Sequence, residues 1–143
     1  MKNWMLTIGF FFMTCGAIYS QSVIGKWKTI DDETGEARSV VEVYEKSGKI
    51  YGKVVEILGT KHKKDVCTKC VGAEKNKSIL GMVIINGLKK DGSEYNGGTI
   101  LDPTTGKKYK CYITLNSPDK LKLRGYIGIS MMGRTQYWTR VKI

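Results

Sequence analysis

Two runs of alternating apolar and polar residues near the C-terminus constrain the fold of this chain more than any other feature. Residues 120–140 read KLKLRGYIGISMMGRTQYWTR. The apolar positions of the first run are Leu121, Leu123, Ile127 and Ile129. They alternate with charged or aromatic residues, the period of a half-buried strand. In the second run Trp138 and Arg140 fall on one face, because successive side chains of a strand point to opposite sides. Glycines border the tip at 130–134 and suit a turn, so the stretch predicts a β-hairpin.

Short apolar segments separated by turns continue through the rest of the chain, which contains 17 glycines. Further strands are predicted over residues 25–30, 39–45, 49–58, 79–88, 97–101 and 107–115. Residues 79–88 fit a strand or a short helix, although their consecutive β-branched residues favour a strand. No long segment shows the period of an amphipathic helix. A closed ring removes the exposed edges of such a sheet. We therefore predict an all-β fold, a single antiparallel up-and-down β-barrel of about eight strands.

The first residues are typical of an export signal. Lys2 precedes an apolar run over 4–14, and a small residue, Ser20, precedes Gln21. The run is shorter than the ~20 apolar residues that a membrane-spanning helix needs, so no span is predicted. We expect residues 1–20 to be a signal peptide and 21–143 to form one barrel domain. The protein is then exported, either periplasmic or associated with the outer envelope. Cys15 leaves a lipoprotein as the alternative.

The chain is basic, with 24 Lys and Arg residues against 13 Asp and Glu residues and a formal net charge of +11. Lysine supplies most of the excess, and lysine is a hydrated point charge rather than a bidentate phosphate ligand. Such a surface fits an anionic component of the cell envelope, or simply a soluble lysine-rich exterior. Export argues against nucleic acid as the partner.

Two residues far apart in the chain resemble the signature of lipocalin-like barrels. Gly25-x-Trp27 lies on the first predicted strand and Arg140 on the last. In such barrels the arginine covers the tryptophan ring near the closed end, a cation–π contact of roughly 0.5–2 kcal/mol. This resemblance gives Trp27 and Arg140 a structural role and implies a lipocalin-like or calycin-like fold.

A longer pattern resembles a bacterial family called domain of unknown function 2147. The matching segments are GKWKTIDDETGEARSVVEVYEKSGKIYGKVVEI, CTKCVG, ILGMVIINGLKKDG, GGTILDPTTGKKYKC and LRGYIGISMMGRTQYWTRV, in this order over residues 24–141. The resemblance implies a small exported envelope protein with a lipocalin-like barrel. It implies no established enzymatic activity, no catalytic residues and no cofactor.

Cys67-Thr68-Lys69-Cys70 is the most chemically suggestive motif. A CxxC forms a local disulfide, a redox pair or half of a zinc site. An oxidising compartment favours the disulfide, and the helix that usually carries a redox CxxC is not predicted here. A zinc site would need Cys111 and the sole histidine, His62. Cys111, however, lies mid-strand and is expected to face the core, so no metal site is predicted.

We expect a binding protein rather than an enzyme. The carboxylates of residues 31–33 lie in one turn, and a single histidine in a cationic loop gives no relay for nucleophilic catalysis. One hypothesis places a small apolar or amphiphilic ligand in the barrel, with a loop tip as its gate. The candidate ligand-binding residues are Met131, Met132, Arg134, Tyr126 and Trp138. The alternative is a filled barrel that docks through its basic face to envelope polyanions or to a protein.

Overall fold

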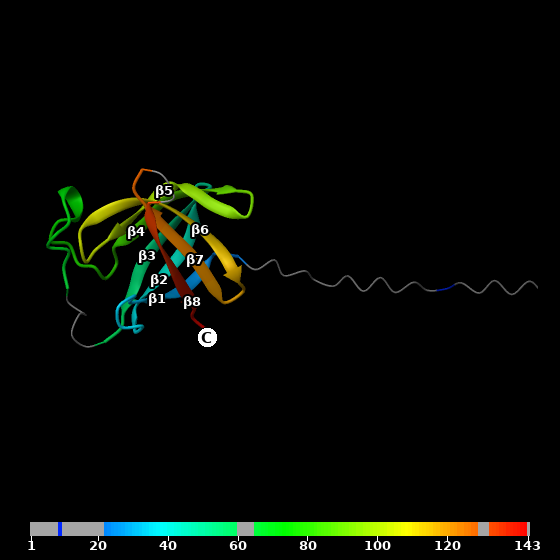
Figure 1. The fold of residues 1–143 in the computed structure, drawn as a ribbon, viewed down its shortest axis with the longest axis horizontal. Coiled ribbons are helices and arrows are strands. Elements are labelled where there is room, and N and C mark those ends of the chain that lie inside the picture. Colours follow the sequence, from blue (N-terminus) through cyan, green and yellow to red (C-terminus); the bar gives the residue numbers. More distant parts are fainter. Residues whose placement is uncertain (1–8, 10–21, 60–64, 129–131, 143) are drawn as a thin grey trace, which may run out of the picture.

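Eight antiparallel strands close into one barrel in the computed structural model, which describes residues 9, 22–59, 65–128 and 132–142 (Figure 1). The strands are β1 (Gly25–Ile30), β2 (Ala37–Lys46), β3 (Lys49–Ile57), β4 (Val83–Asp91), β5 (Glu94–Asp102), β6 (Lys107–Ser117), β7 (Lys120–Tyr126) and β8 (Gly133–Arg140), and a short 3-10 helix, η1, spans Gly72–Glu74. Each strand pairs with the next in sequence, which confirms the predicted up-and-down barrel. Within the described residues no helix is long and apolar enough to cross a membrane.

The first and last strands meet, as predicted. Trp27 pairs with Arg140 and Lys28 with Thr139. The guanidinium carbon of Arg140 lies 4.3 Å from the centroid of the Trp27 ring. Its nitrogens donate hydrogen bonds to three carbonyl oxygens, those of Ser22 (2.6 Å), Ile24 (3.1 Å) and Pro118 (2.9 Å). One side chain therefore joins the N-terminal segment, the β6–β7 turn and the seam between β1 and β8.

Several strand ends differ from the predicted ones by a few residues, and the starts of β4 and β5 are among those that differ most. β4 begins later than the strand predicted over 79–88, because Gly81, with a φ of 88°, bends the chain just before it. β5 begins earlier than predicted over 97–101, directly after the Asp91-Gly92 turn. Gly97 in that strand has a φ of 79° and lies where the β5–β6 register shifts, so a bulge breaks the apolar pattern there.

Ile127 corrects the predicted hairpin. The alternation places it in the core, but its side chain is 62% exposed. β7 ends at Tyr126, and Gly128 then takes a φ of 75°, so the chain leaves the sheet before Ile127 can turn inward. Ile129, the next residue of that pattern, lies outside the described residues.

The barrel has a closed end and a mouth. The closed end holds Trp27, Arg140 and the tight turns β2–β3, β4–β5 and β6–β7. The mouth, at the left in Figure 1, is surrounded by the β1–β2, β3–β4, β5–β6 and β7–β8 connections. Apolar side chains fill the interior near the closed end. The fully buried ones include Trp27, Val41, Val43, Leu88, Ile113, Leu121 and Trp138.

Candidate functional site

Along five of the strands the inward-facing side chains become more exposed toward the mouth. Along β8 the inward-facing residues change from buried Trp138 through half-buried Gln136 to exposed Arg134. β1 changes from buried Trp27 to half-buried Thr29 in the same direction. The same change occurs from Val41 to Ser39 in β2, from Cys111 to Tyr109 in β6 and from Leu123 to Gly125 in β7. On these five strands the inward-facing side chains become more accessible toward the mouth. At the closed end, Tyr95 and Leu115 are half-buried as well.

A glycine leaves room for a small side chain near the mouth. Gly125 faces the interior, and a Cβ atom built on it would lie 3.5 Å from the Tyr109 Cβ and 3.6 Å from the Ile100 Cγ2, an ordinary contact distance. Ile100 and Tyr109 pair directly across β5 and β6, and both are half-buried. The wall above the filled core is therefore apolar and carries a phenol.

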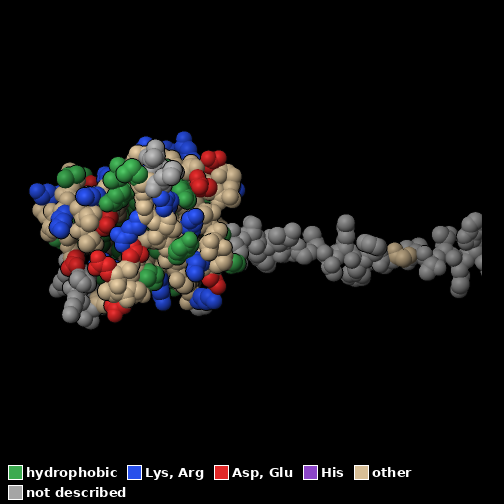
Figure 2. Space-filling model, in the orientation of Figure 1, with side chains coloured by type: hydrophobic (Ala, Val, Ile, Leu, Met, Phe, Trp, Pro, Cys, Tyr) green, Lys and Arg blue, Asp and Glu red, His purple; other side chains and the backbone are tan. Residues whose placement is uncertain are grey.

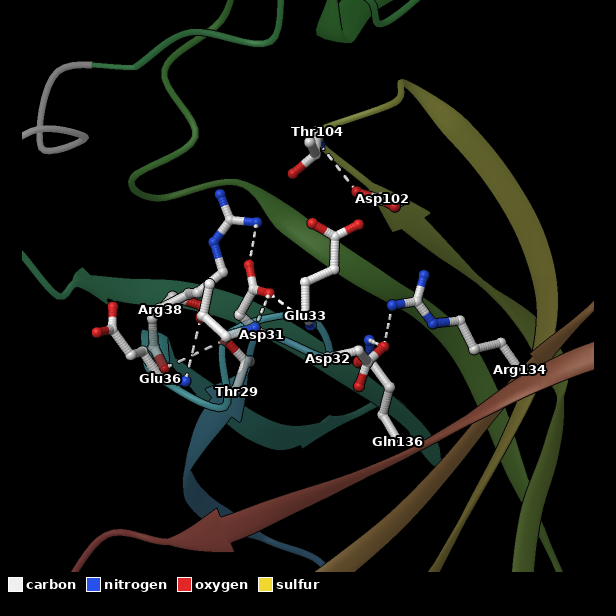
Figure 3. A network of polar contacts seen from close by, with 12 residues as sticks. Thr29, Asp31, Asp32, Glu33, Glu36, Arg38, Asp102, Thr104, Arg134 and Gln136 are labelled. Carbon is white, nitrogen blue, oxygen red and sulfur yellow. Dashed lines mark hydrogen bonds and ion pairs between the residues drawn. The ribbon is translucent and has the colours of Figure 1, made fainter.

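Polar groups ring the mouth above this wall. The β1–β2 turn reaches toward β8, where the Asp32 carboxylate accepts a hydrogen bond from the Gln136 amide (2.9 Å) and pairs with the Arg134 guanidinium (Figure 3). The amide oxygen of Gln136 accepts in turn from the Trp138 indole N–H at 3.3 Å. This chain of contacts connects the solvent-exposed rim to the buried base of the barrel.

Asp31 holds the shape of the same turn. One of its carboxylate oxygens accepts hydrogen bonds from the backbone N–H groups of Glu33 (2.8 Å) and Thr34 (3.1 Å), and the other lies 3.2 Å from Arg38. The bond from Thr34 and then the bond from Glu33 are the main reasons that the pKa of Asp31 lies below its ordinary value, with Arg38 adding to the effect. The turn therefore stays anionic and ordered at neutral pH.

The CxxC motif forms a local disulfide beside the mouth. Cys67 and Cys70 are bonded to each other, with Cα atoms 5.3 Å apart, and both are buried. Val66 bridges to Ser78, which makes this segment a small hairpin. The Cys67 sulfur lies 3.4 Å from the Pro103 carbonyl oxygen, so the hairpin packs against the β5–β6 turn.

The third cysteine of the barrel region faces the core, as predicted. Cys111 is a free thiol that is fully buried, and burial raises its pKa to about 12. A thiol with such a pKa stays protonated at neutral pH and is a poor nucleophile or metal ligand. Among the described residues, no three Asp, Glu, His or Cys residues are grouped to hold a metal ion. His62 lies outside the described residues.

The structure separates the predicted ligand-binding residues. Arg134 lies at the mouth, and Met132 is 69% exposed on the β7–β8 connection. Tyr126 faces the outside of the barrel, where its ring lies 6.4 Å from that of Tyr112. Trp138 lies deep in the core and is 2% exposed. Met131 lies outside the described residues.

Sequence reasoning missed Asp32 and Gln136 as residues of the rim. It treated the acidic run at 31–33 only as a turn. The signal was present in β8, because a period of two places Gln136 on the same face as Trp138. A polar residue at that position indicates a change from core to solvent, and this change is what the mouth shows.

Two hollows among the described residues lie at the closed end. One, of about 400 Å³, is lined by Ile24, Gly25, Lys26, Glu42, Val43, Tyr44, Arg140 and Val141. The other, of about 280 Å³, is lined by Ser22, Val23, Lys90, Gly92, Ser93, Tyr95, Thr114 and Leu115. Both are open to solvent beside the N-terminal segment, and neither includes the inward-facing residues of the mouth.

The chain is similar to one solved barrel over most of its length. That structure is described as "Protein HP1028 from the human pathogen Helicobacter pylori belongs to the lipocalin family". The two chains share 26% sequence identity, with a TM-score of 0.74, and the match covers 86% of this chain and 85% of that one. The fold is therefore lipocalin-like. A comparison with curated proteins finds no match.

The sequence pattern of a bacterial family matches almost the whole barrel. The family is described as "Uncharacterized protein conserved in bacteria (DUF2147)", and the match runs from residue 25 to residue 140. It begins at the first residue of β1 and ends at the last residue of β8. Because the matched region is the complete barrel and most of the chain, the protein belongs to the DUF2147 family.

Proposed function

We propose that this protein is an exported, non-catalytic binding protein that holds a small apolar or amphiphilic ligand at the mouth of its barrel. The observation that carries the proposal is the graded exposure of the inward-facing residues, which rises toward the mouth along β1, β2, β6, β7 and β8. The interior of an eight-stranded barrel is wide enough either to be filled by side chains or to hold one small ligand. The similarity to a structure described as a lipocalin supports the same conclusion.

The chemistry of the mouth fits an amphiphile. Ile100, Tyr109 and the bare Cα of Gly125 offer an apolar wall. The rim above them is polar and charged, with Arg134 and Gln136 both bound to Asp32. A ligand with an apolar body and a polar end can bury the body against this wall and leave its polar end among the rim groups.

Export is part of the proposal, and the N-terminal sequence supports it. A single lysine, a short apolar run and a small residue before Gln21 precede the barrel. We expect the mature protein, recovered from a fractionated host cell, to begin at Gln21 and to be found outside the cytoplasm. N-terminal sequencing of that material tests both statements. A mature chain that retains residues 1–20 in the cytoplasm would contradict them.

Native mass spectrometry of the protein purified from its host is the first test of ligand binding. We expect a bound species of lipid size that is released on unfolding. If the protein carries none, an uncharged apolar dye, N-phenyl-1-naphthylamine, reports whether a site exists. An uncharged probe is chosen because it does not respond to the basic exterior.

A substitution at Gly125 tests where the ligand lies. The backbone of Gly125 does not have a positive φ, and a Cβ atom there meets only ordinary contacts, so a side chain at this position points into the mouth without backbone strain. Gly125→Leu is expected to weaken dye binding at least roughly tenfold, because it occupies the space beside Tyr109 and Ile100. Thr139→Leu places the same leucine side chain on the exposed outer face of β8 and is the control.

Circular dichroism of both variants checks that the barrel still forms. If Gly125→Leu fails to fold, Gly125→Ala, whose methyl group meets only ordinary contacts, takes its place. Unchanged dye binding in a folded Gly125 variant would place the ligand elsewhere. Absence of both a bound species and dye binding would overturn the proposal.

A further inference from the structure

Charge is divided unevenly between the two halves of the barrel. The four neighbouring strands β6, β7, β8 and β1 contain ten Lys and Arg residues and no Asp or Glu. The other four strands, β2 to β5, contain six basic and six acidic residues. The net charge of the barrel strands is therefore concentrated on β6, β7, β8 and β1. Figure 2 shows Lys and Arg side chains, with some Asp and Glu side chains among them, on the face where β7 and β8 lie in front.

Most of these cations point outward from β1, β6 and β7, with β8 between β7 and β1, and we name this side of the barrel the basic wall. Its members are Lys26, Lys28, Lys108, Lys110, Lys120, Lys122 and Arg124. They lie on the opposite face from the buried Trp27, Cys111 and Leu121. Strand pairing places Lys122 between Thr114 and Tyr137. Neighbouring strands are about 4.8 Å apart, so these charges act on a partner together.

Tyrosines lie among the cations of the basic wall. Tyr112 and Tyr126 pack against each other on neighbouring strands. Tyr137 is 45% exposed, and the Lys120 ammonium lies 5.7 Å from the centroid of its ring. Tyrosine has an apolar ring and a polar tip, and it is enriched where one side of a contact is apolar and the other is wet.

An apolar pair lies at the mouth-side corner of the basic wall. Ile127 follows Tyr126 directly, and its backbone N–H donates to the Met132 carbonyl at 3.2 Å. Their side chains are 62% and 69% exposed, among the most exposed large apolar side chains of the described residues. Exposed apolar side chains beside a field of positive charge are the combination that binds an anionic membrane surface.

We propose that the basic wall docks the protein onto an anionic phospholipid bilayer, with Ile127 and Met132 entering the headgroup region. A soluble polyanion would satisfy the lysines but would give no partner to the exposed apolar pair. A bilayer satisfies both, because its surface is negative and its interior apolar. When the protein is docked in this way, the β7–β8 edge of the mouth lies against the lipid, and an amphiphile can enter or leave the barrel there. The docking itself does not depend on the proposed ligand.

Vesicle co-sedimentation with protein purified from its host tests the inference. Vesicles of phosphatidylcholine alone are compared with vesicles that also contain phosphatidylglycerol. We expect binding only to the anionic vesicles, weakened by salt because the contacts are between exposed charges. The Lys28→Glu, Lys110→Glu double variant, which reverses one charge on β1 and one on β6, is expected to bind at least roughly tenfold more weakly.

The matched control is the Lys53→Glu, Lys90→Glu double variant. It changes the net charge equally, at exposed positions on β3 and β4, outside the basic wall. Its binding is expected to change by less than about threefold. An equal loss of vesicle affinity in both double variants would mean that binding depends on net charge and not on the basic wall. That result would overturn the proposal, as would an absence of binding to anionic vesicles. Thermal melts show that both variants are folded.

The Ile127→Ser, Met132→Ser double variant distinguishes a bilayer from a soluble polyanion. We expect it to lose affinity for anionic vesicles at least roughly fivefold while its affinity for dextran sulfate stays unchanged. If vesicle affinity is also unchanged, the partner is a polyanion and the bilayer is excluded. Binding of N-phenyl-1-naphthylamine, measured without vesicles, is expected to be unaffected by the lysine variants, so the two proposals fail independently.

Discussion

Cys111 shows, at the scale of one residue, what the barrel interior does to an ionisable group. Its thiol has no solvent contact, and burial alone raises its pKa from 9.0 to about 12. In the folded protein the thiol keeps its proton well above neutral pH, whereas in the unfolded chain it loses the proton near its ordinary value. The free energy of unfolding therefore falls as the pH rises from about 9 toward 12, because only the unfolded chain releases the thiol proton in this range.

The first prediction follows from this difference. Between pH 8 and pH 10 the free energy of unfolding should fall by about 1.4 kcal/mol through Cys111, since the slope approaches 1.4 kcal/mol per pH unit above the unfolded pKa. Urea unfolding curves across this range measure it. Tyrosines and lysines titrate in the same range, so the Cys111→Ala variant is the reference that lacks only this contribution.

The two proteins should therefore diverge in stability as the pH rises, with the wild type losing more. Parallel curves would show that the thiol is accessible or already ionised in the folded state. A thiol reagent gives an independent readout. Cys111 is expected to react slowly in the folded protein at pH 8 and rapidly in denaturant.

At the scale of an element, the disulfide hairpin shows how a long connection is held. Its two half-cystines pack in the same core cluster as Ile84 and Leu101, which lie on the outer side of β4 and β5. Gly106, with a φ of 72°, lies so close that a Cβ atom would overlap the Lys69 carbonyl group. The hairpin therefore extends the core outside the barrel wall.

The second prediction separates packing from backbone strain. Gly106→Ala should destabilise the protein by about 3 kcal/mol, because it adds both a strained φ and an overlap with the hairpin. Gly35→Ala is the matched control, since Gly35 has nearly the same φ, 73°, and open space around its Cα. It should cost only about 1 kcal/mol. Chemical denaturation of the two variants measures both values.

Hydrogen exchange locates the effect. The amides of residues 65–79 should exchange faster in Gly106→Ala and remain as in the wild type in Gly35→Ala. Equal losses of stability in the two variants, or unchanged exchange over that segment, would show that the hairpin does not pack against the β5–β6 turn.

At the scale of the whole molecule, closure of the ring depends on a short seam. β7 and β8 share seven paired positions, whereas β1 and β8 share two. Arg140 compensates through its contact with Trp27 and its bonds to three carbonyl oxygens. The backbone adds bonds from Arg140 to Asp119 and from Val141 to Lys26. Arg140 therefore provides much of the side-chain contact that holds the seam.

The third prediction is that Arg140→Ala loses about 3 kcal/mol of stability, the sum of a cation–π contact and charged hydrogen bonds. Arg140→Lys should recover less than half of this, because an ammonium cannot reach three acceptors and cover the ring together. Arg38→Ala is the control: its ion pair with Asp31 is exposed and should contribute less than about 1 kcal/mol. Urea denaturation distinguishes these values, and equal losses at Arg140 and Arg38 would refute the special role of the seam.

Much of the barrel could be predicted from local patterns. The alternation at Leu121 and Leu123, together with glycine-containing turns, predicts the positions of strands to within a few residues. This is possible because the side-chain period and the turn dihedrals are local properties. The inward position of Cys111 follows from the same period. Ile127 was misplaced because alternation does not show where a strand ends.

The amino-acid sequence by itself determined an all-β, closed, up-and-down architecture, with Trp27 under Arg140 and a CxxC in a long connection. Only the tertiary structure decided that Asp32 meets Gln136, 104 positions away in the chain, and that β1 joins three acid-free strands to complete the basic wall. The physical reason is that closing a sheet brings distant strands together in a register set by the stagger of the whole barrel. No local pattern encodes that register, so the mouth and the wall emerge only when the ring closes.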